Sequence, residues 1–89
     1  MPTRPSQTDP AAAARWAEVR ALVGANVRRL RLEAGLTQEA LALESGIDRN
    51  LVIGIEHGRR SILSERLPDI AAVLGCSVGD LFGASQSQR

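Results

Sequence analysis

Apolar residues between positions 10 and 34 recur at steps of three and four, which is the spacing of one helix face. They are Trp16, Val19, Val23, Val27, Leu30 and Ala34. Asp9 can cap the first turn, Pro10 suits the first helical position, and Gly35 can end the helix. The pattern therefore predicts one helix over residues 10–34. Gly24 offers the alternative of a break, because glycine weakens a helix interior by about 1 kcal/mol relative to alanine.

Residues 37–56, TQEALALESGIDRNLVIGIE, predict two short helices joined by a tight turn. Thr37 and Asp48 can each accept a capping hydrogen bond, and Gly46 can supply the turn. The positions that face the core are Leu41, Ala42, Ile47, Val52 and Ile55. The small side chain of Ala42 lets the two helix backbones approach where they cross. A helix-turn-helix pair of this kind can present its second helix to the major groove of DNA.

Two apolar segments complete the pattern. Residues 61–75, SILSERLPDIAAVLG, predict a helix whose regular part begins near Leu67, because Pro68 fits only a first turn. Its inward positions are Leu67, Ile70, Ala71 and Leu74. Residues 77–82, SVGDLF, predict a last short helix. We expect flexible tails at 1–9 and 84–89 and one domain over 10–83, with a core at 22–82 and an N-terminal helical extension at 10–21.

The motifs NVRRLRLEAGLTQEALA, GIDRN, IEHGRR and IAAVLGCSVGDLF resemble those of the Cro and phage-repressor regulators, also called the XRE family. The resemblance covers roughly residues 22–82. DRN followed by GIE is similar to controller proteins of restriction-modification systems, and LPDIAAVLG is similar to the fourth helix of phage repressors. It implies an all-α fold, a compact five-helix lambda-repressor-like DNA-binding domain that carries the extension at its N-terminus.

The composition narrows the function classes. The 89 residues leave room for a single domain, and the sequence offers no clustered nucleophile, base, metal set or phosphate loop, so an enzyme is not expected. No apolar run approaches the ~20 residues of a membrane span, and no signal-peptide pattern is visible, which predicts a cytoplasmic protein with no membrane partner. The single cysteine, Cys76, is expected to be a buried structural thiol, and no cofactor is expected.

The net charge is only +1, so DNA binding would depend on where the charges lie. All eleven basic side chains are arginine, which suits bidentate contacts to phosphate and guanine. If Val52 and Ile55 face inward, the candidates for contacts to DNA bases are Arg49, Asn50, Ile53 and Gly54. Arginine can pair with guanine and asparagine with adenine, each worth about 1–3 kcal/mol of discrimination. Ile53 could contact thymine methyls or be core, and Gly54 could permit close backbone approach or be merely tolerated.

The family resemblance implies two further roles. Gln38 would hold a phosphate at the start of the first motif helix, where free amides also point. The phosphate candidates as a set are Thr37, Gln38, Asn26, Arg28, Arg59 and Arg60. Arg31 and Glu56 would form a structural ion pair between the long helix and the end of the second motif helix.

The leading hypothesis is a sequence-specific transcriptional regulator that binds a near-palindromic operator in double-stranded DNA as a homodimer, with reading helices about 34 Å apart. Dimer contacts are expected from Val78, Leu81 and Phe82, and from Trp16 unless that ring covers the core instead. The competing hypothesis is a protein-interaction module, such as an antitoxin that covers a partner toxin. Exposure of Trp16 and Val19 beside an apolar patch would favour it.

Overall fold

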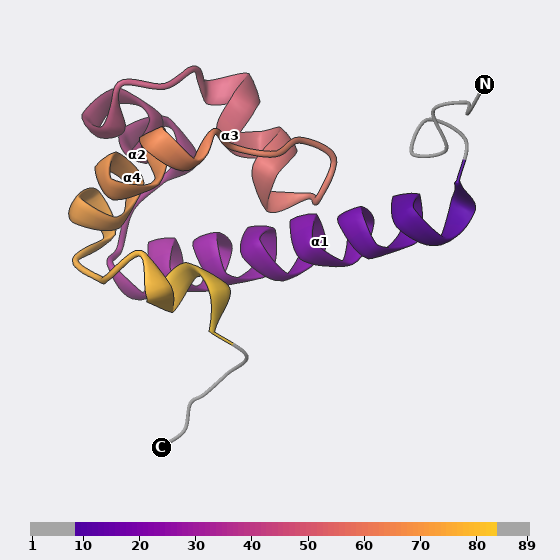
Figure 1. Cartoon of the computed structure of the whole chain (residues 1–89). Coiled ribbons are helices and arrows are strands. Elements are labelled where there is room, and N and C mark those ends of the chain that lie inside the picture. The colour runs from indigo at the N-terminus through magenta and orange to yellow at the C-terminus, as the bar shows by residue number, and fades with distance from the viewer. Residues whose placement is uncertain (1–8, 84–89) are drawn as a thin grey trace.

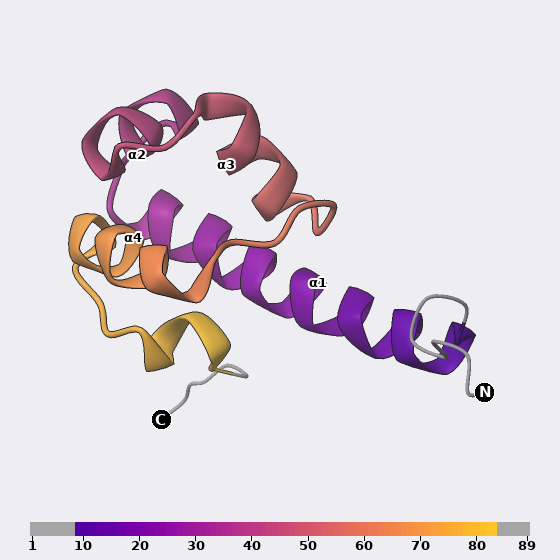
Figure 2. The same cartoon turned by 45° about the horizontal axis from the view of Figure 1, so that its top comes forward.

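A long helix, α1 (Pro10–Glu33), carries three shorter helices on its C-terminal half, and its N-terminal half extends past them (Figures 1 and 2). The computed structural model describes residues 9–83. Asp9 Oδ1 accepts a hydrogen bond from the Ala11 amide at 3.0 Å, and Pro10 occupies the first helical position. The predicted continuous helix is confirmed, and the alternative of a break at Gly24 is wrong.

The next two helices, α2 (Gln38–Ser45) and α3 (Arg49–Glu56), form the predicted helix-turn-helix pair. Thr37 Oγ1 accepts from the Ala40 amide at 3.0 Å, and Asp48 Oδ2 accepts from the Asn50 amide at 2.8 Å. Gly46 adopts a left-handed conformation with φ of 75°, which only glycine reaches without strain. The helix boundaries therefore follow from residues adjacent to them in the sequence.

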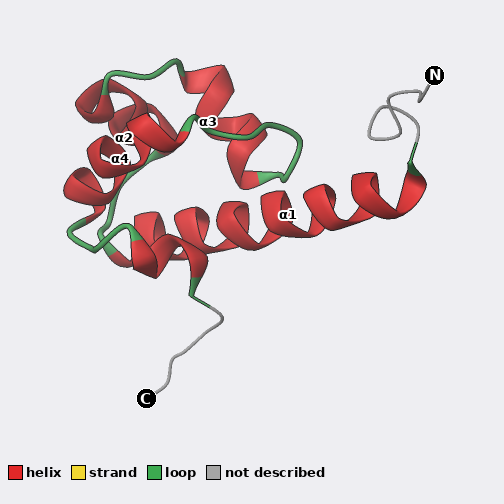
Figure 3. Ribbon diagram, viewed as in Figure 1, coloured by secondary structure: helices red, strands yellow, loops and turns green. Residues whose placement is uncertain are grey.

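The chain then forms a 3-10 turn, η2 (Ser64–Arg66), followed by α4 (Leu67–Leu74) and a second 3-10 turn, η3 (Gly79–Phe82). Pro68 lies in the first turn of α4, as predicted. Within residues 9–83 the fold has four α-helices and no strand (Figure 3), so the expected fifth helix is a 3-10 turn of four residues.

Reciprocal hydrogen bonds begin the turn η3. The Ser77 amide donates to Asp80 Oδ2 at 2.9 Å, and the Asp80 amide donates to Ser77 Oγ at 3.1 Å. The Ser77 amide and hydroxyl lower the pKa of Asp80. Bonds spanning three residues continue from the Leu81 amide to Val78 and from the Gly83 amide to Asp80, which closes a tight turn in place of an α-helix.

The core lies between the four helices and η3. Its fully buried side chains are Leu41, Val52, Ile55, Ile70 and Leu81. The helices α1 and α3 cross closely at Gly24, where an added Cβ would collide with the Ile55 carbonyl oxygen and lie 3.0 Å from that of Glu56. The glycine that weakens α1 by propensity is thus the position that lets α3 approach it.

Cys76 packs half-buried against this core. Burial and the neighbouring Asp80 carboxylate raise the pKa of its thiol, which keeps it protonated at neutral pH. None of the helices that the structure describes is both long and apolar enough to cross a bilayer.

Candidate nucleic-acid interface

The first turn of α3 presents two polar side chains to solvent. Val52 and Ile55, on the opposite face, are 1% and 2% exposed, which turns Arg49 and Asn50 outward. Within residues 9–83 neither side chain makes a hydrogen bond or ion pair with another group. The guanidinium of Arg49 and the amide of Asn50 are therefore available for contacts to bases.

The loop after α3 covers the last turns of this helix, and the predicted contact of Gly54 with DNA bases is therefore wrong. Gly54 is buried, and a Cβ on it would collide with Cγ of Arg60. Its carbonyl oxygen accepts from the amides of Arg59 and Arg60 at 2.8 and 3.1 Å. Gly54 therefore cannot read bases, because the following loop lies over it. Ile53 is half-buried. This degree of burial lies between the two alternatives for its side chain, which were a place in the core and an exposed contact to thymine methyls.

A buried hydrogen-bonded network holds α3 in place. Arg31 Nε donates to Glu56 Oε2 at 2.6 Å, and Nη2 donates to Oε1 at 3.0 Å. The two side chains are only 9% and 2% exposed. Arg31 Nη1 also donates to the Leu36 carbonyl at 2.8 Å. The structure thus brings Arg31 and Glu56 together as a bidentate pair that joins α1 to the end of α3.

Gln38 belongs to the same network. Its Nε2 donates to Glu56 Oε1 at 3.0 Å, which ties the start of α2 to the end of α3. A side-chain amide has two donor hydrogens, so one remains for a phosphate. Thr37 is exposed, and its hydroxyl accepts the capping bond and keeps its own hydrogen to donate. Sequence reasoning missed the Gln38–Glu56 contact.

Asn26 was predicted to contact phosphate, and this is wrong. The side chain is 6% exposed, and its Nδ2 donates to the carbonyls of Leu81 and Gly83 at 2.9 and 2.7 Å. Its Oδ1 accepts from Arg29 Nη2 at 3.3 Å. Asn26 therefore anchors the C-terminal turn to α1. The remaining phosphate candidates, Arg28, Arg59 and Arg60, are exposed.

Arg66 is a further positioning residue, and no local signal in the sequence pointed to it. Its Nη2 donates to the carbonyls of Ser45 and Gly46 at 3.2 and 3.3 Å, and its Nε donates to Asp69. The side chain thus reaches back to satisfy carbonyls at the C-terminus of α2 and braces the turn before α3.

The predicted dimer residues separate into two groups. Leu81 is fully buried in the core, so its assignment to an interface is wrong. Val78 is half-buried against the core, whereas Phe82 and Trp16 remain 44% and 48% exposed. The alternative in which Trp16 covers the core is therefore wrong, and its ring is available for contact with another molecule.

Comparison with known proteins agrees with this geometry. A helix-turn-helix family model matches residues 27–81. An uncharacterized HTH-type transcriptional regulator of Sinorhizobium fredii, y4dJ, is 42% identical over 60 residues, which cover 67% of this chain and 78% of that protein. The control protein C.BamHI of Bacillus amyloliquefaciens is 34% identical over 65 residues, 72% of this chain and 80% of its own.

A solved structure has a fold similar to that of this chain. The restriction-modification controller protein C.AhdI from Aeromonas hydrophila superimposes with a TM-score of 0.68 and 36% identity, over 71% of this chain and 96% of that chain. The fold of this chain is thus similar to that of C.AhdI over nearly the whole length of C.AhdI.

Proposed function

The chain belongs to the Cro/repressor-like (XRE) family of helix-turn-helix proteins, and we propose that it regulates transcription by binding a defined sequence in double-stranded DNA. In this proposal the first turn of α3 enters the major groove. Such helices read bases through residues near their N-terminus. The similar proteins are named as regulators or control proteins, which supports regulation over catalysis.

The observation that carries the proposal is the contrast between the two ends of α3. Arg49 and Asn50 are exposed on a capped first turn, while the last turn is held by the Arg31–Glu56 pair. A helix of eight residues is not stable in isolation, so tertiary contacts must fix its direction. The result is a short, rigid helix whose free end carries a guanidinium and an amide, the groups that pair bidentately with guanine and adenine.

Replacing Arg49 with alanine is expected to change which bases are preferred. Selection of bound sequences from random DNA should yield a near-palindromic site with wild-type protein. With Arg49→Ala, the preference at one position in each half-site should relax by about 1–3 kcal/mol. Identical preferred bases for the two proteins would show that Arg49 does not read bases.

Replacing a residue that contacts phosphate is expected to change the affinity and its salt dependence without changing the preferred bases. Arg59→Ala should weaken binding to all sequences alike and reduce the dependence of log affinity on log salt by about 0.9 per lost contact in each bound copy. Arg29→Ala is the matched control, since it removes the same charge from an exposed side chain paired with Glu33. Fluorescence anisotropy with labelled duplex at several salt concentrations measures both. Equal slopes for the two variants would remove Arg59 from the interface.

We propose that two copies act together, because one α3 supplies few base contacts. A two-fold dimer would place two reading helices about 34 Å apart on a near-palindromic operator. The similar proteins include regulators and restriction-modification controllers, so the family by itself does not select which genes this chain controls.

A protein-interaction role is the second candidate, and the exposure of Trp16 and Val19 favours it. These side chains are 48% and 51% exposed, on the half of α1 that extends past the other helices (Figure 1). An antitoxin-like module would use such a surface to bind an unrelated protein. Purification of the tagged full chain from its own host would test this role, since a partner lost on Trp16→Ala would support it.

A further inference from the structure

One face of α1 contacts the end of α3 and the loop that follows it at three levels. Arg31 pairs with Glu56, and Gly24 lies against backbone carbonyls of α3. Arg20 Nε donates to the Gly58 carbonyl at 3.1 Å. Arg20, Gly24 and Arg31 are separated by four and seven residues, a spacing that places them on the same side of a helix. Arg20 is the member of this series that reaches the loop.

The two arginines on this face differ in what their guanidinium groups bind. All three side-chain nitrogens of Arg31 donate to acceptors in the protein, and its side chain is 9% exposed. Arg20 is half-buried, and within residues 9–83 only its Nε has a partner. Its two Nη nitrogens carry four hydrogens that remain available to donate. Arg31 is therefore a structural residue, whereas Arg20 has donors left for a ligand.

The loop that Arg20 contacts carries two more arginines. A Cβ on Gly58 would lie 3.3 Å from the Ala21 Cα, so the loop lies directly on α1. The amides of Arg59 and Arg60 donate to a carbonyl of α3, which fixes the backbone of the loop. Their side chains are exposed, and neither forms an ion pair with any residue that the structure describes. The side chains are thus free to bind an anion while the backbone is held.

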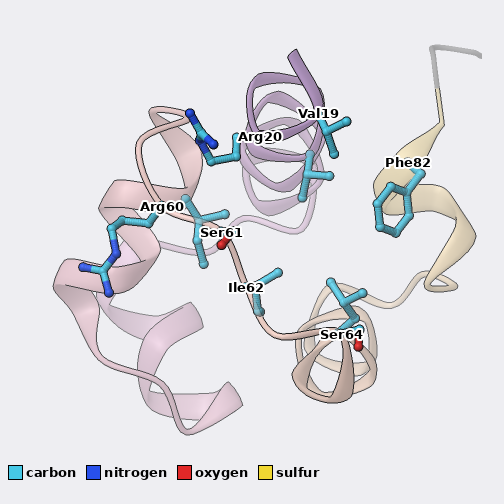
Figure 4. Close-up of a pocket in the computed structure, with 10 residues that line it drawn as sticks. Val19, Arg20, Arg60, Ser61, Ile62, Ser64 and Phe82 are labelled. Carbon is cyan, nitrogen blue, oxygen red and sulfur yellow. The ribbon is translucent and has the colours of Figure 1, made fainter. Parts of the chain in front are cut away.

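The arginines of α1 and of the loop direct their charges outward. Arg20 and Arg60 both line the apolar hollow between α1 and the loop, but their guanidinium groups point away from the apolar side chains around it (Figure 4). Glu56, the acidic residue before the loop, is bound to Arg31. Glu18 lies two residues before Arg20, a spacing at which helical side chains do not face each other. Positive charge therefore collects here without a carboxylate to neutralise it.

We propose that Arg20 binds a phosphate of the DNA backbone beside the phosphates bound by Arg59 and Arg60. This inference rests on the proposed function and adds α1 to its DNA interface. With α3 in the major groove, the segments beside it face the backbone that borders the groove. A row of anionic oxygens suits several arginines, each of which can bind phosphate bidentately. Arg20 precedes residue 27, where the match to the family model begins.

Replacing Arg20 with alanine is expected to weaken binding of the full chain to a duplex with one half-site about tenfold. The loss should be the same on a duplex of unrelated sequence, because phosphates carry no base information. The slope of log affinity against log salt should fall by about 0.9. Arg20→Lys should restore the slope, since lysine keeps the charge. Anisotropy titrations at several salt concentrations measure both quantities, and urea unfolding checks that each variant is folded.

Arg15→Ala provides the comparison for loss of charge alone. Arg15 is exposed, has no ion pair among the described residues, and lies on the same half of α1. It is five residues before Arg20, which places it on a different side of the helix. Its replacement should leave the salt slope unchanged. If Arg15→Ala and Arg20→Ala gave equal slopes, the proposal would be overturned.

A double variant separates a phosphate contact from support of the loop. If Arg20 and Arg59 each bind a phosphate, their reductions in slope should add in Arg20→Ala/Arg59→Ala. If Arg20 only held the Gly58 carbonyl so that Arg59 could bind, the double variant would have the slope of Arg59→Ala alone. That result would contradict the proposal.

Base preference keeps this inference apart from the function on which it rests. In selection from random DNA, Arg20→Ala should prefer the same bases as wild-type protein, and a changed preference would contradict a phosphate contact. Wild-type protein without any base preference would refute the proposed function. The salt slopes on the unrelated duplex would still decide whether Arg20 binds phosphate.

Discussion

Replacing Arg31 with alanine is expected to lower the free energy of unfolding by about 3–5 kcal/mol, because it leaves the Glu56 carboxylate buried without its counterion. The Glu56 side chain is 2% exposed, and two of its three hydrogen-bond donors come from Arg31. Small domains are stable by only about 5–15 kcal/mol in total. Urea unfolding followed by far-UV circular dichroism would measure the loss.

The neighbouring ion pair on α1 provides the control. Arg29 and Glu33 meet at 3.4 Å with side chains 47% and 62% exposed. Arg29→Ala removes this pair and the 3.3 Å hydrogen bond to Asn26 Oδ1, so it should cost no more than about 1–2 kcal/mol. The double variant Arg31→Met with Glu56→Leu should recover most of the loss, because it removes both charges. Equal losses in the two single variants would mean that burial does not set the strength of the Arg31–Glu56 pair.

Three contacts from different parts of the chain together fix the orientation of α3. The Arg31–Glu56 pair fixes its last turn, Gly24 allows α1 to approach, and Arg66 braces the turn before it. None of these contacts involves an aromatic side chain, and the chain has only one tryptophan and one phenylalanine. A protein of this composition holds α3 by close backbone approach and buried polar bonds, which tolerate little change in volume or charge.

The features that sequence predicted well are local ones. Asp9, Thr37 and Asp48 cap helices within two or three residues of themselves, and Gly46 forms the turn that its neighbours require. Pro68 limits the start of α4 in the same way. Such signals act over one helical turn, so they can be read without knowing the tertiary structure.

The predictions that failed concern residues that are covered by another segment of the chain, either a distant one or the loop after α3. Gly54 faces away from the core as the helix period requires, but the loop carrying Arg60 folds back over it. Asn26 is buried by η3, 55 residues further along the chain. Its spacing from Val23 and Leu30 placed it on the apolar stripe, and a polar residue there signals a buried hydrogen bond.

Replacing Gly24 with alanine is expected to destabilise the protein although alanine favours a helix. Helix propensity alone predicts a gain of about 1 kcal/mol. Overpacking typically costs about 1–3 kcal/mol, and here the new Cβ meets backbone carbonyls of Ile55 and Glu56, which cannot rotate away as a side chain can. We expect the upper part of that range, so the net loss of stability should be about 2 kcal/mol. Urea unfolding measures it directly.

Gly79→Ala is the matched control, because the only neighbour that its Cβ would meet within the described chain is Ser77 Oγ, at 3.7 Å. Reduced freedom of the unfolded chain should then raise stability by up to about 1 kcal/mol. The two glycine replacements should therefore change stability in opposite directions. A gain for Gly24→Ala would mean that α1 and α3 separate without cost, and the close crossing would no longer explain how α3 is held in place.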